Sequence, residues 1–320
     1  MVKRIGILTS GGDCPGMNAA IRAVVREALD NGLGICGFRR GFAGLIDNDC
    51  TGMDITSVGG ILQRGGTILL TARYEEFKET EAQRLALENI EKNKLDALVV
   101  IGGDGSLRGA NALENLGVRT MGIPASIDND IYGTDMALGV DTALNNIVEV
   151  VDKIKVTATS HERTFIIEVM GRGSGYLALI SAITTGAEAA IIPEVSYDLE
   201  KIAARIKEGY KRGKTNNLII VAEGAGTSFE ISRRLEKMAG IQSKITVLGH
   251  LQRGGAPTCF DRLLGSRFGT SAVEALVEGI SGKMVGLANR EIKLIDYKEV
   301  FAKTKVFSKK LVQLAELLGR

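Results

Sequence analysis

The sequence predicts an α/β protein made of two doubly wound, mostly parallel sheet domains with helices on both faces. Short apolar runs typical of strands alternate with stretches of helical periodicity along the whole chain. The runs are continuously apolar, as expected where helices cover both faces of a parallel sheet. The expected strands are residues 4–8, 97–101, 120–123, 164–169, 218–222, 245–248 and 284–287. The expected helices lie near residues 18–31, 81–92, 141–158, 199–212 and 270–278.

The composition indicates a folded chain with a large core, since 45% of its 320 residues are apolar and 24% are charged. A net charge of +2, with acids spread among the basic residues, predicts no nucleic-acid partner. The four cysteines lack the spacing of a metal site or a disulfide framework, which favours free thiols in a reducing compartment. We see no signal peptide and no apolar segment that would span a membrane, so we expect a cytoplasmic protein without membrane contact.

Glycines and charged residues gather directly after the expected strands. The 40 glycines exceed the usual share of ~7%. Six strand ends carry glycine, acids or arginine, in the segments SGGD, GGDGS, PASIDND, MGRGSG, AEGAG and GHLQRGG. In doubly wound folds, ligands bind beyond the carboxyl ends of the strands. These six segments are therefore the predicted ligand site.

Residues 102–106, which read GGDGS, predict phosphate binding. A buried strand ends in glycines and a helix follows, so backbone N–H groups can approach phosphate oxygens beside a positive helix N-terminus. Asp104 would hold Mg²⁺ that bridges the phosphates; the alternative is a tight turn with Asp104 as the N-cap. The segment has neither the Walker A nor the G-x-G-x-x-G signature, which disfavours those two nucleotide-binding classes.

Asp128 and Asp130 stand two residues apart in the segment that follows another expected strand. In an extended segment their side chains would point the same way. Two neighbouring anions need a cation, a donor or chemistry to offset their repulsion. We therefore expect one of them to be a general base for an attacking hydroxyl and the other to lie near a metal. An Asp/Asn-rich turn is the alternative.

Basic residues stand in similar glycine-rich or polar segments. The candidate anion clamps are Arg73, Arg163, Arg172 and Arg253. Each of them alone is more typical of a solvated surface charge, and only their common setting favours a ligand. Of the two histidines, we expect His250 to be a ligand group and His161 to be a turn or capping residue.

Six ordered motifs resemble those of one family. Residues 11–18 read GGDCPGMN, and GGDGS, IDNDI, SHER, EVMGR and GHLQRGG-x-P-T-x-x-D-R follow along the chain. In this order and register, over nearly the whole chain, they are similar to the bacterial ATP-dependent 6-phosphofructokinases. A single GGDG segment is less specific, because NAD kinases and lipid kinases resemble it too.

The resemblance implies phosphoryl transfer from MgATP to the 1-hydroxyl of fructose 6-phosphate, giving fructose 1,6-bisphosphate and ADP. It implies Mg²⁺ as cofactor with Asp104 as metal ligand, and a homotetramer in which Arg163 and Lys244 reach in from a neighbouring subunit. The implied catalytic residues are Asp128 (the general base), Arg172, Asp130 and Ser126. The implied ATP-binding residues are Gly12, Phe42, Arg73, Lys78, Asp104, Gly105, Ser106 and Gly109. The implied substrate-binding residues are Ser126, Arg163, Met170, Gly171, Arg172, Glu223, Lys244, His250 and Arg253.

The resemblance also implies the domain boundaries and an effector site. The ATP-binding domain would comprise residues 1–138 plus 251–302, and the sugar-phosphate-binding domain residues 139–250 plus 303–320. A site for ADP or phosphoenolpyruvate as effector would comprise Arg22, Arg26, Lys155, Glu188, Arg212 and Lys214. Ile55 and Gly60 stand where an arginine and an aspartate are expected, which removes two groups that would bind a nucleotide effector and its metal.

Gly105 and Ala125 bear on the phosphoryl donor, and Lys244 bears on the substrate. Gly105 stands where pyrophosphate-dependent relatives carry aspartate, and Ala125 where they carry lysine, so both favour ATP. Lys244 replaces an arginine and so exchanges a bidentate clamp for a point charge, which predicts weaker sugar-phosphate binding. Three alternatives remain: a pyrophosphate-dependent phosphofructokinase, a non-catalytic nucleotide-binding regulatory protein, and an NAD-dependent oxidoreductase, against which the missing G-x-G-x-x-G signature argues.

Overall fold

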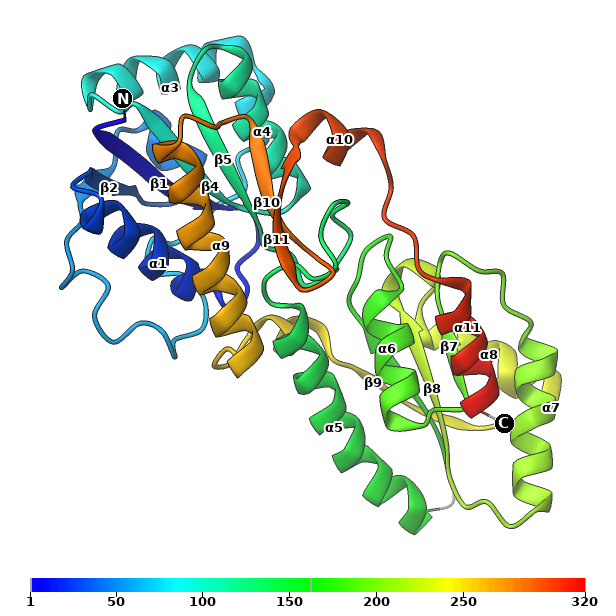
Figure 1. The fold of residues 1–320 in the computed structure, drawn as a ribbon. Coiled ribbons are helices and arrows are strands. Elements are labelled where there is room, and N and C mark those ends of the chain that lie inside the picture. The colour runs from blue at the N-terminus through cyan, green and yellow to red at the C-terminus, as the bar shows by residue number, and fades with distance from the viewer. Residues whose placement is uncertain (1, 162, 320) are drawn as a thin grey trace. The chain divides into compact units, whose positions relative to one another are not determined.

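The computed structural model describes residues 2–161 and 163–319, which form two compact units (Figure 1). Unit 1 consists of the residues up to 126, Ile131–Thr142 and Arg253–Lys305. Unit 2 consists of Ile127–Asp130, Ala143–Gln252 and the residues from 306 onward. The assignment of one unit to ATP and the other to a sugar phosphate stays a prediction. In the described part of the chain, every helix is too short or too polar to cross a lipid bilayer.

Unit 1 is built on a seven-stranded sheet with the order β11-β10-β5-β4-β1-β2-β3. Pairing is parallel from β10 to β2 and antiparallel at both edges. The strands are β1 (Arg4–Ser10), β2 (Gly34–Phe38), β3 (Cys50–Gly52), β4 (Ala97–Gly102), β5 (Arg119–Pro124), β10 (Lys283–Ala288) and β11 (Glu291–Asp296). The helices are α1 (Met17–Asp30), α2 (Phe42–Ile46), α3 (Thr80–Lys92), α4 (Asp104–Asn115), α9 (Cys259–Val277) and α10 (Tyr297–Ala302), with the 3-10 turn η1 (Glu75–Lys78).

Helices cover both faces of this sheet. Alternate residues of a strand point to opposite faces, and every residue of β4 is buried. Leu98 and Val100 of β4 pack with α3, α4 and α10 in one core cluster. Helices α1 and α9 pack against each other (Figure 1). Their close approach requires glycine, because a Cβ on Gly269 would lie 2.6 Å from the carbonyl oxygen of Ala20.

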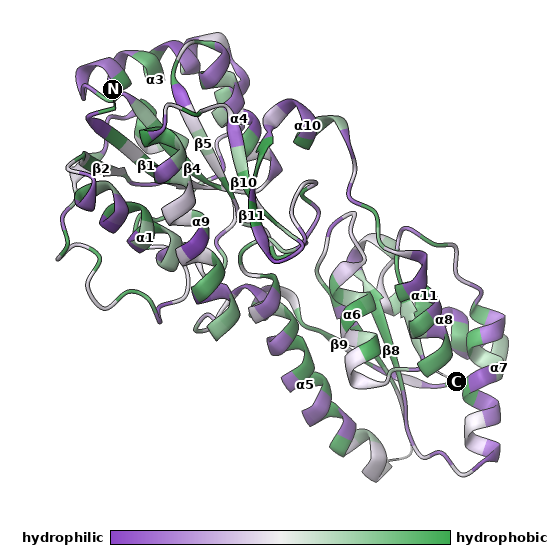
Figure 2. Ribbon diagram, viewed as in Figure 1, coloured by the Kyte–Doolittle hydropathy of each residue, from purple (hydrophilic) through white to green (hydrophobic). Residues whose placement is uncertain are grey.

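Unit 2 is built on a four-stranded parallel sheet with the order β7-β8-β6-β9. The strands are β6 (Thr164–Val169), β7 (Ala189–Ile191), β8 (Asn217–Ala222) and β9 (Ser243–Val247). The other elements are α5 (Val140–His161), which begins in unit 1, α6 (Tyr176–Thr185), α7 (Leu199–Lys211), α8 (Ser228–Ala239), α11 (Lys309–Leu318) and the 3-10 turns η2 (Glu223–Ala225) and η3 (Gly249–Arg253). Ile219 and Val221 of β8 share a core cluster with α7 and α8. Figure 2 shows β8 in the apolar colour beside helices of mixed polarity.

The predicted α/β fold class is confirmed, and all the expected strands are present. The sequence did not reveal β2, β3, β7 and β11. Strands β3 and β7 have three residues each, and two glycines interrupt the apolar pattern of β2. The side chain of His161, expected at a turn or cap, lies outside the described residues.

A buried carboxylate ties the start of α9 to the start of α5. Asp261 is fully buried and accepts hydrogen bonds from the amides of Gly139 and Thr142, both at 2.9 Å, and from the Thr142 hydroxyl at 2.5 Å. Thr258 caps α9 by accepting from the Asp261 amide at 3.2 Å. Burial raises the pKa of Asp261, although the hydrogen bonds favour its ionised form.

Asp261→Asn is expected to lower the free energy of unfolding by about 1–3 kcal/mol, because an NH₂ group cannot accept the bonds from Thr142. Since the folded-state pKa of Asp261 is raised above its ordinary value of 3.8, its protonation stabilises the fold at low pH. This contribution is lost as the pH rises through the raised pKa. Denaturant unfolding at several pH values should show the gap between wild type and variant narrowing with rising pH. A gap that stays constant or widens would contradict the raised pKa.

Candidate functional site

The carboxyl ends of β1, β4 and β5 lie side by side in unit 1. Ser10 pairs in register with Gly102, and Gly102 pairs with Pro124. The segments that follow these strands therefore leave the sheet at one edge. They are residues 11–13, 103–106 and 125–126. Three of the six predicted ligand segments thus meet in unit 1.

The turn from β4 into α4 is tight at its start and open further on. A Cβ on Gly102 would lie 2.5 Å from both the Ser10 carbonyl oxygen and Ser106 Oγ. Gly105, in contrast, is exposed, and a Cβ there would meet no atom within 4 Å. The first N–H groups of a helix have no intrahelical partner, and its N-terminus is positive. This turn therefore offers donors and open space to a phosphate.

Asp104 opens α4 with a carboxylate that pairs with Arg108 at 2.8 Å, and both side chains are about half exposed. The N-cap is Gly103, so the alternative with Asp104 as N-cap is wrong. The described residues contain no cluster of three His, Cys, Asp or Glu that would hold a metal ion unaided. Mg²⁺ typically binds one or two carboxylates together with phosphate oxygens and water. Asp104 therefore fits a metal ion that arrives with a nucleotide.

An aromatic pair packs against Gly109 of α4. The Phe42 and Phe77 rings stack with centroids 4.1 Å apart, and a Cβ on Gly109 would lie 2.6 Å from Phe42 Cζ. Both rings are buried, with Phe42 3% and Phe77 4% exposed. Gly109 thus makes room for this pair. Direct contact between Phe42 and a nucleotide stays a prediction.

The loop that carries Arg73 is tied to the segment after β1. The Gly11 amide donates to the Ala72 carbonyl at 3.2 Å, and the Thr71 hydroxyl donates to the Gly11 carbonyl at 2.9 Å. These bonds bring Arg73, which is exposed, beside the first glycines of unit 1. Lys78, also exposed, ends η1 further along the same loop.

Arg253 lies over the same β1 segment. Its Nη1 donates to the Asp13 carbonyl at 3.1 Å, and a Cβ on Gly12 would lie 2.6 Å from this nitrogen. Glycine at position 12 therefore admits the guanidinium. The structure places Arg253, predicted to bind the substrate, next to Gly12, predicted to bind ATP.

In unit 2 a buried carboxylate faces a guanidinium at the ends of the strands. Asp128 is 2% exposed, and its Oδ2 lies 3.6 Å from Nε of Arg172. The Arg172 side chain is 56% exposed. The pair therefore combines a desolvated carboxylate with a cation that can reach a ligand from solvent.

The prediction that Asp128 and Asp130 point the same way is wrong. Asn129 has φ 51°, in the left-handed region, so the segment is not extended there. Asp128 is buried, whereas Asp130 is exposed. The two carboxylates have different surroundings, as required if they serve different roles.

The loop after β6, which carries Arg172, follows a narrowly defined path. Gly171 has φ 144° and Arg172 has φ 50°. A Cβ on Gly171 would clash with the carbonyl oxygen of Ser174, and one on Gly224 with the carbonyl oxygen of Arg172. The Arg172 amide donates to Glu223 Oε1 at 2.9 Å. The loops after β6 and β8 therefore fix each other.

Arg163 and Lys244 lie at the other end of the unit 2 sheet. Arg163 directly precedes β6, whereas Arg172 follows it, and six residues of strand span about 20 Å. Lys244 pairs with Phe165 near the start of β6, whereas His250 follows β9. The structure thus does not bring Arg163 and Lys244 to Arg172 within one chain. Their role in a neighbouring subunit stays a prediction.

Three of the predicted effector residues converge at the end of α6. Lys155 donates to the Thr185 carbonyl, and Lys214 pairs with Glu188, which is buried and accepts from the Leu218 amide. The lysines are thus engaged within the chain. The other predicted effector residues are Arg212, which pairs with Glu208 at 3.1 Å, and Arg22 and Arg26, which lie on α1 in unit 1.

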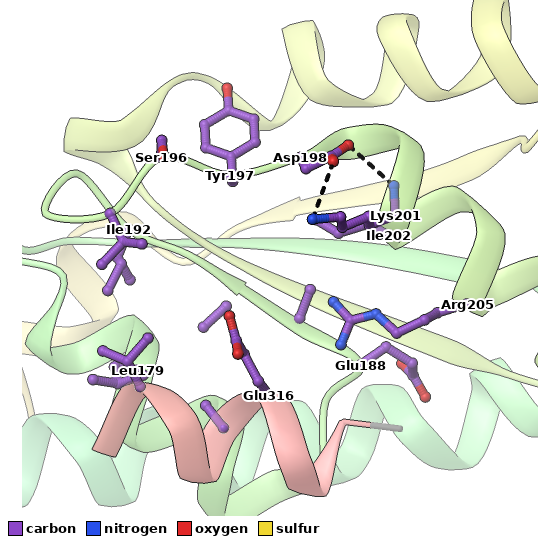
Figure 3. A pocket seen from close by; sticks show the side chains of 15 residues that line it. Leu179, Glu188, Ile192, Ser196, Tyr197, Asp198, Lys201, Ile202, Arg205 and Glu316 are labelled. Carbon is purple, nitrogen blue, oxygen red and sulfur yellow. Dashed lines mark hydrogen bonds and ion pairs between the residues drawn. The ribbon is translucent and has the colours of Figure 1, made fainter. Parts of the chain in front are cut away.

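A cavity of about 170 Å³ lies beside β7 in unit 2 (Figure 3). Leu179, Ile192 and Ile202 form apolar parts of its wall. Asp198, also in the wall, caps α7 by accepting from two backbone amides. Of the predicted site residues, Glu188 alone lines this described cavity. The cavity therefore belongs to none of the predicted catalytic, ATP or substrate sets.

The family model described as phosphofructokinase matches residues 4–276 of this chain. The chain belongs to the phosphofructokinase family. Proteins named ATP-dependent 6-phosphofructokinase from Natranaerobius thermophilus and Halalkalibacterium halodurans are each 50% identical to it over 318 residues. The matches cover 99% of this chain and 100% of each relative. The family predicted from the ordered motifs is confirmed.

Solved phosphofructokinase structures share the fold of this chain. That of Pichia pastoris phosphofructokinase has a TM-score of 0.89 at 37% identity, and the match covers 94% of this chain and 36% of the Pichia pastoris chain. A pyrophosphate-dependent phosphofructokinase from Marinobacter aquaeolei has a TM-score of 0.86 at 18% identity, covering 99% of this chain and 91% of its own. At 18% identity, the match to the Marinobacter aquaeolei protein is evidence for the fold and not for the phosphoryl donor.

Sequence reasoning missed two amide side chains that hold segments of the candidate site in place. Asn18 accepts from the Ile68 amide at 2.8 Å and donates to the Arg64 carbonyl at 3.0 Å, which holds the loop leading to Arg73. Gln252 is fully buried and bridges two strand-end loops. Both residues stand inside motifs used for the family resemblance. That position was the only available signal, because a neutral amide does not stand out beside arginine and aspartate.

Proposed function

We propose that this phosphofructokinase transfers the γ-phosphoryl group of ATP to the 1-hydroxyl of fructose 6-phosphate, giving fructose 1,6-bisphosphate and ADP. The observation that carries the proposal is the buried Asp128 carboxylate facing the exposed Arg172 guanidinium at 3.6 Å. Relatives 50% identical over their full length and named ATP-dependent 6-phosphofructokinase support the choice of donor and acceptor. Gly105, with open space instead of a carboxylate, supports ATP over pyrophosphate.

In the proposed reaction the 1-hydroxyl oxygen attacks the γ-phosphorus, the bond from phosphorus to the ADP oxygen breaks, and Asp128 takes the hydroxyl proton. General base catalysis of this kind contributes typically ~10²–10⁴-fold. Phosphoryl transfer otherwise depends on positioning and on neutralising the charge of the transferring group. Arg172 supplies positive charge to that group, and Ser126 orients the acceptor.

Mg²⁺ is the proposed cofactor, held by Asp104 and the phosphate oxygens of ATP, with Asp130 near it. When bound, the ion would neutralise charge on the β- and γ-phosphates. The amide groups at the start of α4 and the cations Arg73 and Lys78 would hold the remaining phosphate oxygens. We also propose, from the resemblance to the ATP-dependent 6-phosphofructokinases, that the protein is cytoplasmic.

The sugar phosphate is proposed to bind at the strand ends of unit 2. There Glu223 and His250 would bind its hydroxyls, and Met170 and Gly171 would pack against it. Its phosphate would be held by Arg253 and by Arg163 and Lys244 of a neighbouring subunit. This arrangement requires an oligomer, and we propose a homotetramer. Sedimentation of the full chain tests it, and a monomer with full activity would exclude the shared site.

Lys244→Arg is expected to lower the KM for fructose 6-phosphate by about three- to tenfold, because a guanidinium binds phosphate through two hydrogen bonds where an ammonium acts as a point charge. The exposed position of residue 244 in β9 makes the exchange tolerable for the fold. Steady-state kinetics at saturating ATP measures the effect. An unchanged or raised KM would show that residue 244 does not bind the phosphate.

Turnover of the wild-type chain with fructose 6-phosphate decides the proposed function. ATP with Mg²⁺ should support it, and pyrophosphate with Mg²⁺ should not. Activity with pyrophosphate alone would identify a pyrophosphate-dependent enzyme. Binding of ATP without any turnover would indicate a regulatory protein that has lost catalysis.

Regulation by ADP or phosphoenolpyruvate is proposed for the Lys155, Glu188 and Lys214 group. An anionic effector would have to compete with Glu188 for Lys214 and with the Thr185 carbonyl for Lys155. Velocity curves measured against fructose 6-phosphate with and without each effector test this. Curves that coincide would remove the proposal.

A further inference from the structure

Gln252 joins the loops that follow β6 and β9. Its side chain is fully buried. Its Oε1 accepts from the Met170 amide at 3.1 Å, and its Nε2 donates to the Gly249 carbonyl at 2.9 Å. One neutral side chain thus engages a backbone donor in one loop and a backbone acceptor in the other. All three residues belong to unit 2.

The bond to Met170 complements the one from Arg172 to Glu223. Met170 and Arg172 flank Gly171, so side chains from neighbouring strand ends hold the amides on both sides of this glycine. Gly171 and Arg172 both have positive φ, which is uncommon for a residue with a side chain. Such a conformation persists only where surrounding contacts determine it. Gln252 and Glu223 are two such contacts.

We propose that Gln252 is a positioning residue for the sugar phosphate: it sets the path of the Met170–Arg172 segment and thereby the approach of the Arg172 guanidinium to substrate. Gln252 itself is fully buried and would act through this segment, without touching the substrate. The inference rests on the proposed function, because it assigns Met170, Gly171 and Arg172 to fructose 6-phosphate. It adds a determinant of affinity and turnover that lies inside the protein.

A purely structural role would have different consequences. Asn217, at the start of β8 in the same unit, is also a fully buried amide, and within the described residues neither of its side-chain polar atoms has a hydrogen-bond partner. Replacing either amide changes the core of unit 2. Only the change at Gln252 releases a loop that carries predicted substrate residues. Asn217→Leu is therefore the matched control.

The first experiment compares Gln252→Met, which keeps the length but removes donor and acceptor, with Asn217→Leu and wild type. For Gln252→Met we expect the KM for fructose 6-phosphate to rise about tenfold and kcat to fall, because the Met170 amide and the Gly249 carbonyl both lose their side-chain partner. The KM for ATP should stay within about twofold, and Asn217→Leu should leave all three constants near wild type. Equal changes in both KM values, or none, would overturn the inference.

The second experiment uses Gln252→Glu and remains decisive if Gln252→Met does not fold. An ionised carboxylate accepts from Met170 but cannot donate to Gly249, whereas a protonated carboxyl can do both. We therefore compare the Kd for fructose 6-phosphate of the variant with that of wild type at the same pH. The ratio of the two should exceed one at pH 8 and fall towards one as the pH is lowered to 6. Burial raises the pKa of the introduced carboxyl from its ordinary value towards this range. A ratio that does not change with pH would contradict the positioning role.

The two experiments separate the inference from the proposed function. Wild-type protein that neither binds nor phosphorylates fructose 6-phosphate would overturn the proposed function, and the inference with it. Normal wild-type turnover together with a wild-type-like Gln252→Met would overturn the inference alone.

Discussion

Asp128→Asn is expected to lower kcat by about 10²–10⁴-fold, the usual contribution of a general base. The KM for fructose 6-phosphate should stay constant or fall. Asparagine keeps the size of the side chain but removes a negative charge that lies 3.6 Å from Arg172. The guanidinium is then free to attract the substrate phosphate groups. Steady-state kinetics of the variant, with its unfolding midpoint as a check on the fold, measures both effects.

Asp130→Asn is the matched control for this prediction. Asp130 is exposed, two residues away, and proposed to act near the metal. The activity lost in Asp130→Asn should be restored in part by raising the Mg²⁺ concentration. The activity lost in Asp128→Asn should not be restored in this way. If Asp128→Asn stays within tenfold of wild type, or recovers with Mg²⁺, the general base is another group. The control separates proton transfer from metal binding.

The strand-end segments could be predicted because their signals are local. In residues 97–106 a continuous apolar run, a pair of glycines and an acidic helix start follow one another directly. Local sequence therefore determines the turn and the exposed helix N-terminus. The same holds for the loop after β6, where Gly171 takes a conformation that a Cβ would exclude.

The Asp128–Asp130 prediction failed because a spacing rule assumes a backbone conformation. Two residues of extended chain place side chains on one face. Asn129 adopts the left-handed region instead, which asparagine tolerates better than most residues. The sequence contained the asparagine, but nothing local required it to take this conformation. The exposed and buried positions of the two carboxylates follow from that one residue.

Contacts between distant parts of the chain were beyond reach from the sequence. Arg253 donates to the Asp13 carbonyl from 240 positions along the chain. Gln252 accepts a hydrogen bond from the Met170 amide, which lies 82 positions earlier in the sequence. In both cases the partner is a backbone atom, which carries no residue-type signal. Short strands such as β7 were missed because three residues show no period.

Gly105→Asp is expected to raise the KM for ATP by about 10²–10³-fold, because a second carboxylate would stand beside Asp104 where the phosphates are proposed to bind. The new carboxylate and a phosphate group about 4 Å away would repel each other by ~4 kcal/mol near a protein surface. The fold should tolerate the change: a Cβ at residue 105 meets no atom within 4 Å. An acid in the first turn of α4 also interacts favourably with the helix dipole. The stability of the variant should therefore stay the same or rise, while its affinity for ATP falls.

Gly105→Asn is the control for this prediction, since it adds nearly the same volume without the charge. It should raise the KM for ATP by less than about tenfold. Kinetics with ATP and with pyrophosphate, combined with thermal unfolding, gives all the required quantities. If both variants impair ATP use equally, the effect is steric and Gly105 does not select the donor by charge. If Gly105→Asp leaves ATP use intact, the phosphates do not lie at the start of α4, and the proposed nucleotide site has to be placed elsewhere in the fold.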